Sequence, residues 1–192
     1  MSDLRKIQTH LGIPADGILG PQTLAAIAKA LGMKHAPSPV PTIPDDYCPM
    51  LTKIESGNQP YIKAITSSAS GLYQFIRSTW EGEGGKWGPN MAKAFGGLKP
   101  SQAEQLQRAK SFTAKNADVL KTNAIPINKA SLYAAHFFGA GTAIKVIGAD
   151  VNARADLIAG AKATKANPTI LKGKTVGQFL TWLHGKTGEW AR

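Results

Sequence analysis

The sequence has 192 residues, a length that suits one domain with a small additional module. Its apolar share of 43% is typical of a folded globular protein, and its single cysteine, Cys48, excludes an internal disulfide framework or a multi-cysteine zinc site within one chain. We interpret Cys48 as a small, half-buried hydrophobic residue. The formal net charge is +11, and residues 47–192 hold 19 lysines and arginines against 8 aspartates and glutamates. This excess favours a polyanionic partner, a class that includes nucleic acid, acidic lipid headgroups and cell-wall polymers.

The first 33 residues predict two short helices around a turn. Gly12 and Gly32 are expected to end the helices, and the turn at residues 16–21 combines two glycines with a proline. Apolar residues recur every three or four positions on both sides of it: Leu4, Ile7 and Leu11, then Leu24, Ile27 and Leu31.

The same segment resembles the helical peptidoglycan-binding module of cell-wall hydrolases. The resemblance rests on Ile7-Gln8, Leu11-Gly12, Ala26-Ile27 and above all the run Asp16-Gly17-Ile18-Leu19-Gly20-Pro21-Gln22-Thr23, although this copy is shorter than the usual module. It implies a wall-binding module over residues 1–35 that uses Asp16, Gly17, Gly20 and Thr23. Asp16 and Thr23 can equally shape the turn and cap the second helix, and the two interpretations are compatible.

A proline-rich linker is predicted over residues 36–46, which read APSPVPTIPDD. Alternating prolines disfavour helix and favour a stiff extended spacer of about 3 Å per residue. We therefore expect a domain boundary here, with residues 47–192 forming the larger, catalytic part.

A helix that begins after Asp45 or Asp46 is expected to end at Ser56-Gly57-Asn58. Its apolar stripe consists of Tyr47, Met50, Leu51 and Ile54, and Glu55 lies at the edge of this stripe. Partial burial and the negative end of the helix dipole should both raise the pKa of Glu55. A raised pKa is what a general acid needs near neutral pH.

The next segment is also expected to contribute to a cleft. The spacing of Leu72, Phe75, Ile76 and Trp80 predicts a helix over residues 71–80, with Tyr73 and Gln74 off its buried side. Backbone N–H groups near residues 69–71 would face a ligand at the start of that helix. A short irregular or hairpin segment is expected between Gly82 and Asn90.

Further helices are predicted from their start signals. Ser101 to Glu104 form a capping box before a helix that runs to about Thr122, and Thr175 to Gln178 form a second one. Other helices are expected from Asn128 to Gly139, from Thr142 through Ile147, and over residues 153–165. No stretch reads as a convincing strand, so we predict an all-α fold.

Three blocks of this larger part resemble the soluble lytic transglycosylase and goose-type lysozyme superfamily over about residues 47–150. The blocks are Glu55-Ser56-Gly57, then Ala69 to Ile76 with Ser78-Thr79-Trp80, and finally Ala135-His136-Phe137-Phe138-Gly139-Ala140-Gly141, which departs from the family's common Ala-Tyr-Asn-Ala-Gly form. The resemblance implies a lysozyme-like helical domain that cleaves the β-1,4 bond between N-acetylmuramic acid and N-acetylglucosamine in peptidoglycan.

The same resemblance implies roles for individual residues. Glu55 would protonate the glycosidic oxygen and later act as a base. The residues that would line the sugar groove are Ser70, Tyr73, Gln74 and Phe75, and those that would close it near the acid are Tyr133, His136 and Phe138. For Tyr133 and His136 the alternatives of a core aromatic and a satisfied buried histidine stay open.

The number of acidic residues near Glu55 in the sequence helps to distinguish transglycosylation from hydrolysis. Classical glycosidases use two carboxyl groups, whereas no Asp or Glu lies between Glu55 and Glu81, and position 64 is an alanine where phage lysozymes carry an aspartate. A single-acid route therefore fits better. In lytic transglycosylases the substrate's own acetamido group and 6-hydroxyl complete the reaction and give a 1,6-anhydro product. A hydrolytic muramidase that uses Glu81 or Glu83 as second carboxylate remains the alternative.

No cofactor is expected, because the four histidines lack paired metal-ligand spacing and Gly82, Gly84 and Gly85 lack the Lys-Ser or Lys-Thr of a phosphate-binding loop. Taken together, the sequence predicts a monomeric, modular endolysin of a phage that infects Gram-negative bacteria. Its expected partners are peptidoglycan and the anionic envelope surface. With no secretory signal found, it would pass from the host cytoplasm to the periplasm once a holin permeabilises the inner membrane. An inactive wall-binding virion protein and a basic nucleic-acid binder are the alternatives from other classes.

Overall fold

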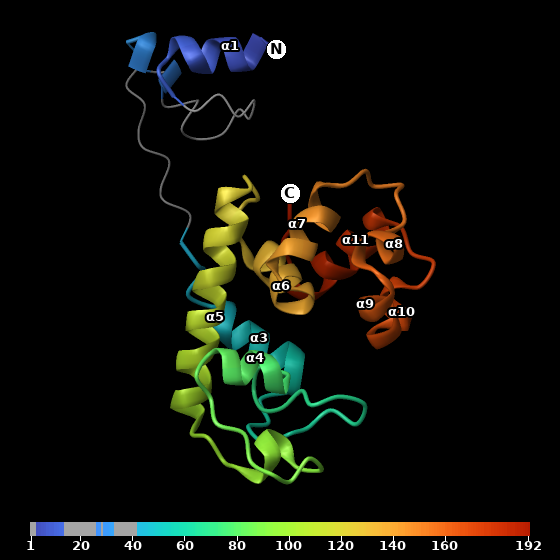
Figure 1. The fold of residues 1–192 in the computed structure, drawn as a ribbon. Helices are drawn as coiled ribbons and strands as arrows, with labels where there is room; N and C mark the ends of the chain where they lie inside the picture. Colours follow the sequence, from blue (N-terminus) through green and yellow to red (C-terminus); the bar gives the residue numbers. More distant parts are fainter. Residues whose placement is uncertain (1–2, 14–25, 28, 33–41) are drawn as a thin grey trace. The chain divides into compact units, whose positions relative to one another are not determined.

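The computed structural model describes residues 3–13, 26–27, 29–32 and 42–192, in two compact units that divide between Thr42 and Ile43 (Figure 1). In the first unit, α1 spans Asp3–His10, and Gly12 follows it with a φ of +68°. Ile7 is 45% exposed, so it does not lie on a buried face as its spacing predicted. The wall-module residues Asp16, Gly17, Gly20 and Thr23 lie outside the described residues, as does linker segment 36–41.

The second unit consists of helices joined by irregular segments, which confirms the all-α prediction. Pairing between extended segments is limited, in the described residues, to three isolated bridges: Lys63 with Ser70, Ser70 with Phe75, and Arg154 with Thr175. The helices are α3 (Tyr47–Ser56), α4 (Arg77–Gly82), the 3-10 helix η1 (Ala94–Gly97), α5 (Gln102–Thr122), α6 (Lys129–Phe138), α7 (Ala140–Gly148), α8 (Ala155–Ala159), α9 (Ala161–Ala166), α10 (Pro168–Leu171) and α11 (Val176–Thr187).

The core of this unit forms where α6 packs against α5, α7 and α11, and where α3 packs against α5 (Figure 1). The α6 sequence, KASLYAAHFF, is apolar over most of its surface because neighbours cover it on several sides. The largest fully buried side chains include Trp80, Tyr47, Phe95 and Phe179. Burying such aromatic groups supplies much of the hydrophobic stabilisation of a domain of this size.

Several predicted helix starts are confirmed by their caps. Ser101 Oγ accepts the N–H of Glu104 at 3.1 Å, and α5 ends at Thr122 as expected. Asn128 caps α6 through a reciprocal pair of hydrogen bonds with Ser131. A capping box between Thr175 and Gln178 likewise opens α11. These helix starts could be predicted from the sequence because each capping side chain satisfies backbone N–H groups within one turn of itself.

The predicted helix over residues 71–80 is wrong at its start, because α4 begins only at Arg77. Residues 70–75 form a tight turn that the Ser70 N–H closes by donating to the Phe75 carbonyl at 3.0 Å. Gly71 and Gln74 take left-handed φ values of +77° and +47° inside it. Leu72 and Phe75 mimic helical spacing because both point from this turn into the core.

Three further expectations need correction. The helix predicted over residues 153–165 breaks at Gly160, whose φ is +87°, and so divides into α8 and α9. The α7 helix begins at Ala140, two residues before the expected Thr142. Asp46 occupies the N-cap position of α3, but its carboxylate accepts from Lys129 Nζ at 3.0 Å instead of capping a helix N–H.

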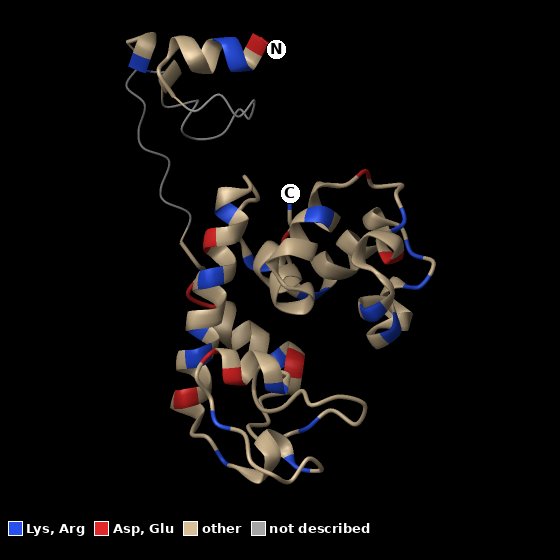
Figure 2. Ribbon diagram, viewed as in Figure 1, with Lys and Arg blue, Asp and Glu red and all other residues tan. Residues whose placement is uncertain are grey.

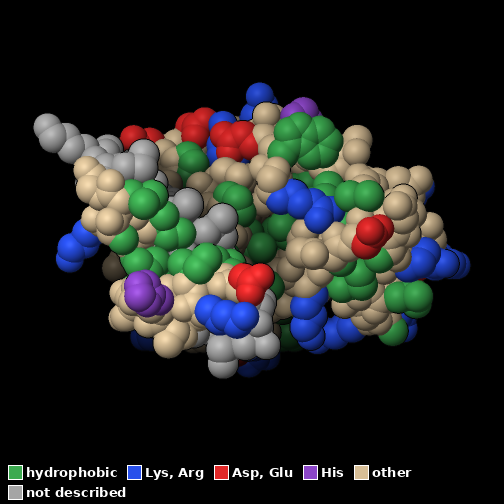
Figure 3. Space-filling model, turned by 90° about the horizontal axis from the view of Figure 1, so that it is seen from above, with side chains coloured by type: hydrophobic (Ala, Val, Ile, Leu, Met, Phe, Trp, Pro, Cys, Tyr) green, Lys and Arg blue, Asp and Glu red, His purple; other side chains and the backbone are tan. Residues whose placement is uncertain are grey.

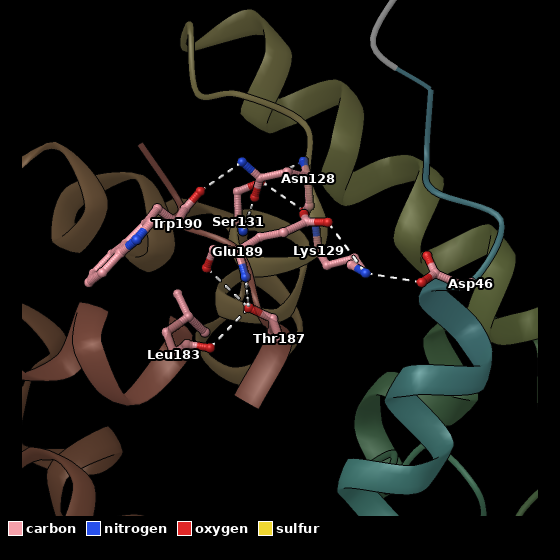
Figure 4. Close-up of polar contacts among 8 residues, drawn as sticks. All are labelled: Asp46, Asn128, Lys129, Ser131, Leu183, Thr187, Glu189 and Trp190. Atoms are coloured by element: carbon pink, nitrogen blue, oxygen red, sulfur yellow. Dashed lines mark hydrogen bonds and ion pairs between the residues drawn. The ribbon is translucent and has the colours of Figure 1, made fainter. Parts of the chain in front are cut away.

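Lys129 holds three segments together at the start of α6 (Figure 4). Its Nζ lies 3.0 Å from Asp46 at the start of α3 and 3.4 Å from Glu189 beyond α11. Its backbone N–H also donates to Glu189 Oε2 at 2.8 Å, and the Asn128 side chain donates to the Trp190 carbonyl at 2.9 Å. This group of contacts ties the chain's C-terminal segment to the helix that carries Glu55.

Candidate active site

A cleft of about 660 Å³ opens beside the C-terminal end of α3. Residues of six of the described helices line it: α3, α4, α5, α6, α10 and α11. Segment 69–76, Gly139 after α6 and Asn167 before α10 complete the lining. This volume suits a small organic ligand or a short stretch of a polymer. The lining residues are Ile54, Glu55, Ala69, Gln74, Phe75, Ile76, Thr79, Phe112, Tyr133, His136, Phe137, Phe138, Gly139, Asn167, Ile170, Trp182 and Lys186.

Glu55 is the penultimate residue of α3, where the predicted stop at Gly57 is confirmed by a left-handed φ of +58°. Two hydroxyl groups fix the C-terminal end of α3. Ser56 Oγ donates to the Thr52 carbonyl at 2.9 Å, and Thr52 Oγ1 lies 2.7 Å from Asn58 Oδ1. Because the chain turns away directly after Ser56, the Glu55 side chain is held at the helix end and faces the cleft.

The environment of Glu55 raises the pKa of its carboxyl group, mainly because burial penalises the charged form. Two groups act in the opposite direction: the Tyr133 hydroxyl, which is placed to donate a hydrogen bond to the carboxylate, and the positive charge of Lys186. Since desolvation has the larger effect, Glu55 holds its proton to a higher pH than an exposed glutamate does. This is the property of a general acid.

His136 lies in the cleft wall and is fixed by one hydrogen bond, from Nε2 to the Tyr73 carbonyl at 3.0 Å. A carbonyl only accepts, so Nε2 carries the proton and Nδ1 is an acceptor. Nδ1 is buried and has no hydrogen-bond partner among the described residues. Burial lowers the pKa of His136 to about 4, so the ring is neutral near pH 7.

Aromatic rings form much of the cleft surface. Tyr133 stacks on Trp182 with ring centroids 5.9 Å apart and lies parallel to His136 at 6.5 Å. Phe75 contacts Phe112 edge to face at 5.4 Å. These rings contact each other and form an apolar layer beside Glu55, in which Phe75 and Tyr133 are only 3% and 4% exposed and mainly fix the shape of the cleft.

The structure places most of the predicted site residues together, with two exceptions. Glu55, Gln74, Phe75, Tyr133, His136 and Phe138 all line the cleft. Ser70 and Tyr73 are not among the lining residues: Ser70 Oγ accepts the Phe95 N–H at 3.2 Å inside the fold, and Tyr73 packs against Phe75. Because residues 70–75 form a turn and not a helix, Leu72, Tyr73 and Phe75 are all buried, and of the turn only Gln74 is partly exposed. Ser70 fixes the turn, and Tyr73 offers its carbonyl to His136.

The two acids considered as a second carboxylate lie outside the cleft lining. Glu81 forms an ion pair with Arg77 at 3.0 Å. Glu83 forms an ion pair with Lys115 at 2.9 Å and accepts from Ser111 Oγ at 2.8 Å. Among the described residues that line the cleft, Glu55 alone carries a carboxylate.

Several cleft residues were not foreseen: Phe112, Asn167, Ile170, Trp182 and Lys186. Phe112 comes from α5, inside the stretch of the lysozyme-like resemblance but outside its three sequence blocks. The other four come from segments after residue 150, beyond that stretch. Trp182 stands among apolar residues of α11 such as Phe179 and Leu183, a pattern that indicates core packing and not a binding site. No local pattern in the sequence marks Lys186 or Asn167, because only the packing of α10 and α11 brings them to the cleft.

Nothing in the described ranges suggests a metal centre or a membrane span: no group of three or more metal-ligating side chains occurs there, and no helix there is long and apolar enough to cross a bilayer. No family model matches the sequence.

Proposed function

We propose that this protein cleaves the β-1,4 bond between N-acetylmuramic acid and N-acetylglucosamine in peptidoglycan, as a lytic transglycosylase with one general acid/base. The observation that carries the proposal is that Glu55, with a raised pKa, is the single carboxylate among the described residues of an aromatic-lined cleft. The resemblance of three sequence blocks to the lytic transglycosylase and goose-type lysozyme superfamily supports the same reaction.

In the proposed reaction, protonated Glu55 donates its proton to the glycosidic oxygen as the bond to C1 of the muramyl sugar breaks. The substrate's acetamido oxygen stabilises the positive charge that develops at C1. The ionised Glu55 then removes the proton from the 6-hydroxyl of the same sugar, whose oxygen bonds to C1 and gives a 1,6-anhydro end. Tyr133 and Lys186 stabilise the carboxylate during the interval in which it is charged.

The position of the other acids supports transglycosylation over hydrolysis. In the classical hydrolytic mechanisms a second carboxylate across the sugar from the acid acts as nucleophile or activates the attacking water. Glu81 and Glu83 are held in ion pairs with Arg77 and Lys115, and neither belongs to the cleft lining.

The positive charge is distributed in a way that suits an extended anionic surface. Lysine and arginine residues are spread along the ribbon of the larger unit (Figure 2), and on the one face drawn in Figure 3 most of the basic side chains are interspersed with polar and apolar ones. Nucleic-acid binders typically concentrate basic residues into one stripe or patch. We therefore propose the bacterial envelope as partner and an endolysin role, with release to the periplasm through a holin.

The decisive experiment is mass spectrometry of the muropeptides released from purified peptidoglycan. Transglycosylation gives 1,6-anhydro ends, whereas hydrolysis gives reducing ends that are heavier by one water. We expect anhydro products. Reducing ends alone would replace the mechanism by hydrolysis, and the absence of any released glycan at high enzyme concentration would favour the inactive wall-binding alternative.

A further inference from the structure

A second hollow adjoins the cleft on the far side of Ile54. It measures about 640 Å³ and shares Ile54 and Lys186 with the cleft, so the two form one connected surface. Its remaining lining residues are Asp46, Pro49, Met50 and Lys53. Met50, Lys53 and Ile54 are spaced three and four apart and so share one face of α3. The helix that presents Glu55 to the cleft thus presents a different face to this hollow.

Two lysine side chains line the hollow. Lys53 comes from α3 and Lys186 from α11, both are exposed, and neither forms an ion pair in the part of the chain that the structure describes. Asp46 is the single acid of the lining, and Lys129 already pairs with it at 3.0 Å. The remaining lining, Pro49, Met50 and Ile54, is apolar. A ligand that fits must combine negative charge with small apolar groups.

We propose that this hollow is a subsite for the stem peptide of the glycan strand, in which Lys53 and Lys186 bind peptide carboxylates. The inference rests on the proposed function, because the stem peptide is carried by the muramyl sugar that would lie at Glu55. Stem peptides combine free carboxylates with the methyl groups of alanine, which matches two lysines set in an apolar surface. A strand held in the cleft brings its peptide to the hollow at no further cost in translational freedom.

The subsite predicts a preference for strands that retain their peptides. The test compares initial cleavage rates on intact glycan strands with those on strands stripped of peptide by an amidase, for the wild-type full chain, Lys53→Gln and the double variant Lys53→Gln with Lys186→Gln. Lys121→Gln, an exposed lysine at the end of α5, is the control with the same charge change. Far-UV circular dichroism and thermal melts establish that each variant is folded.

We expect the wild type to have a higher kcat/KM on intact than on stripped strands. That ratio should fall about threefold in Lys53→Gln, chiefly through KM, because exposed ion pairs are individually weak, and about tenfold in the double variant. Loss of the Lys186 charge beside Glu55 should also change cleavage of both substrates alike, an effect that cancels in the ratio. Lys121→Gln should keep the wild-type ratio.

Two results would overturn the subsite while leaving glycan cleavage in place: equal ratios in Lys53→Gln and wild type, or the same loss in Lys121→Gln, which would indicate general charge attraction. Failure of the wild type to cleave either substrate would instead reject the proposed function and the subsite with it.

Discussion

At the scale of single residues, the site depends on opposing influences on one carboxyl group. Burial raises the pKa of Glu55, and Tyr133 and Lys186 lower it. A raised pKa means that the folded protein binds this proton more tightly than the unfolded chain does. The free energy of unfolding therefore decreases as the pH rises from the ordinary glutamate value through the raised one. The ionised form of Glu55 is therefore accommodated at the expense of stability.

Replacing Glu55 by glutamine should therefore separate activity from stability. We expect Glu55→Gln to lose at least about 100-fold in glycan cleavage, since general acid catalysis contributes that much or more. At a pH above the raised pKa of Glu55, its melting temperature should equal or exceed that of the wild type, because a partly buried charge has been removed. Dye release from labelled peptidoglycan and scanning calorimetry measure the two quantities. Glu81→Gln, which changes an acid outside the cleft lining, should keep most of the activity.

The pH dependence of wild-type activity should follow the same group. Cleavage should decrease as the pH rises through the raised pKa of Glu55, because the acid loses the proton it must donate.

His136 makes a separate contribution to the pH dependence of stability. In the unfolded chain this side chain takes up a proton near pH 6.5. In the folded protein it does so only near pH 4, because burial lowers its pKa to about 4. Stability is therefore complete above pH 6.5 and is lost as the pH falls toward 4, by at most about 3 kcal/mol. Urea unfolding at pH 7 and pH 4.5 should show a larger loss for wild type than for His136→Gln. Equal losses would contradict a buried neutral histidine.

At the scale of elements, local signals predicted helix starts well, and tertiary packing decided the rest. Ser101, Asn128 and Thr175 cap their own helices, so their neighbours in the sequence were sufficient to predict them. The turn at residues 70–75 was not predictable in this way, because Gln105, far along the chain, accepts the Leu72 N–H at 2.8 Å and holds it. Glu55 at a helix end could be predicted from the sequence, whereas Lys186 at its side could not.

The turn gives a direct test of this packing. A Cβ at Gly71 would collide with the Gln105 side chain and the Phe95 ring, and the left-handed φ of +77° disfavours any other residue. We expect Gly71→Ala to destabilise the protein by about 2–4 kcal/mol in urea unfolding. Gly82→Ala is the matched control, since its Cβ would meet nothing within 4 Å and its φ is not left-handed. A similar change for both variants would show that the 70–75 turn is not held as described.

At the scale of the larger unit, the two ends of its sequence meet at Lys129. Asp46 lies near the beginning of this unit and Glu189 near its end, and the same ammonium group lies within 3.4 Å of both (Figure 4). The Trp190 carbonyl is held beside Lys129, because it accepts a hydrogen bond from the side chain of the preceding residue, Asn128. The helix that carries Glu55 and the helix that carries Lys186 are thereby fixed to one point outside the cleft.

Removing this contact should loosen the unit as a whole. We expect Lys129→Gln to lower the melting temperature by a few degrees at low salt, and by less in 1 M NaCl, because ions screen the interaction. Arg77→Gln, which breaks the exposed pair with Glu81 within one helix, should have a smaller effect. Differential scanning fluorimetry at two salt concentrations makes the comparison, and an equal melting temperature for Lys129→Gln and wild type would contradict the role of this contact.

Gln105 has a consequence for how the protein acquires its cleft during synthesis. Its side chain accepts from Leu72 and donates to the carbonyls of Pro60 and Pro100, at 2.8, 3.0 and 3.2 Å, so that one amide joins three loops. During translation Leu72 leaves the ribosome 33 residues before Gln105 does, and Lys186 leaves later still. A nascent chain therefore carries Glu55 long before it has a cleft. Products of synthesis interrupted before α11 would hold the acid without the walls of the cleft, and the proposed activity would arise only after α11 has been made.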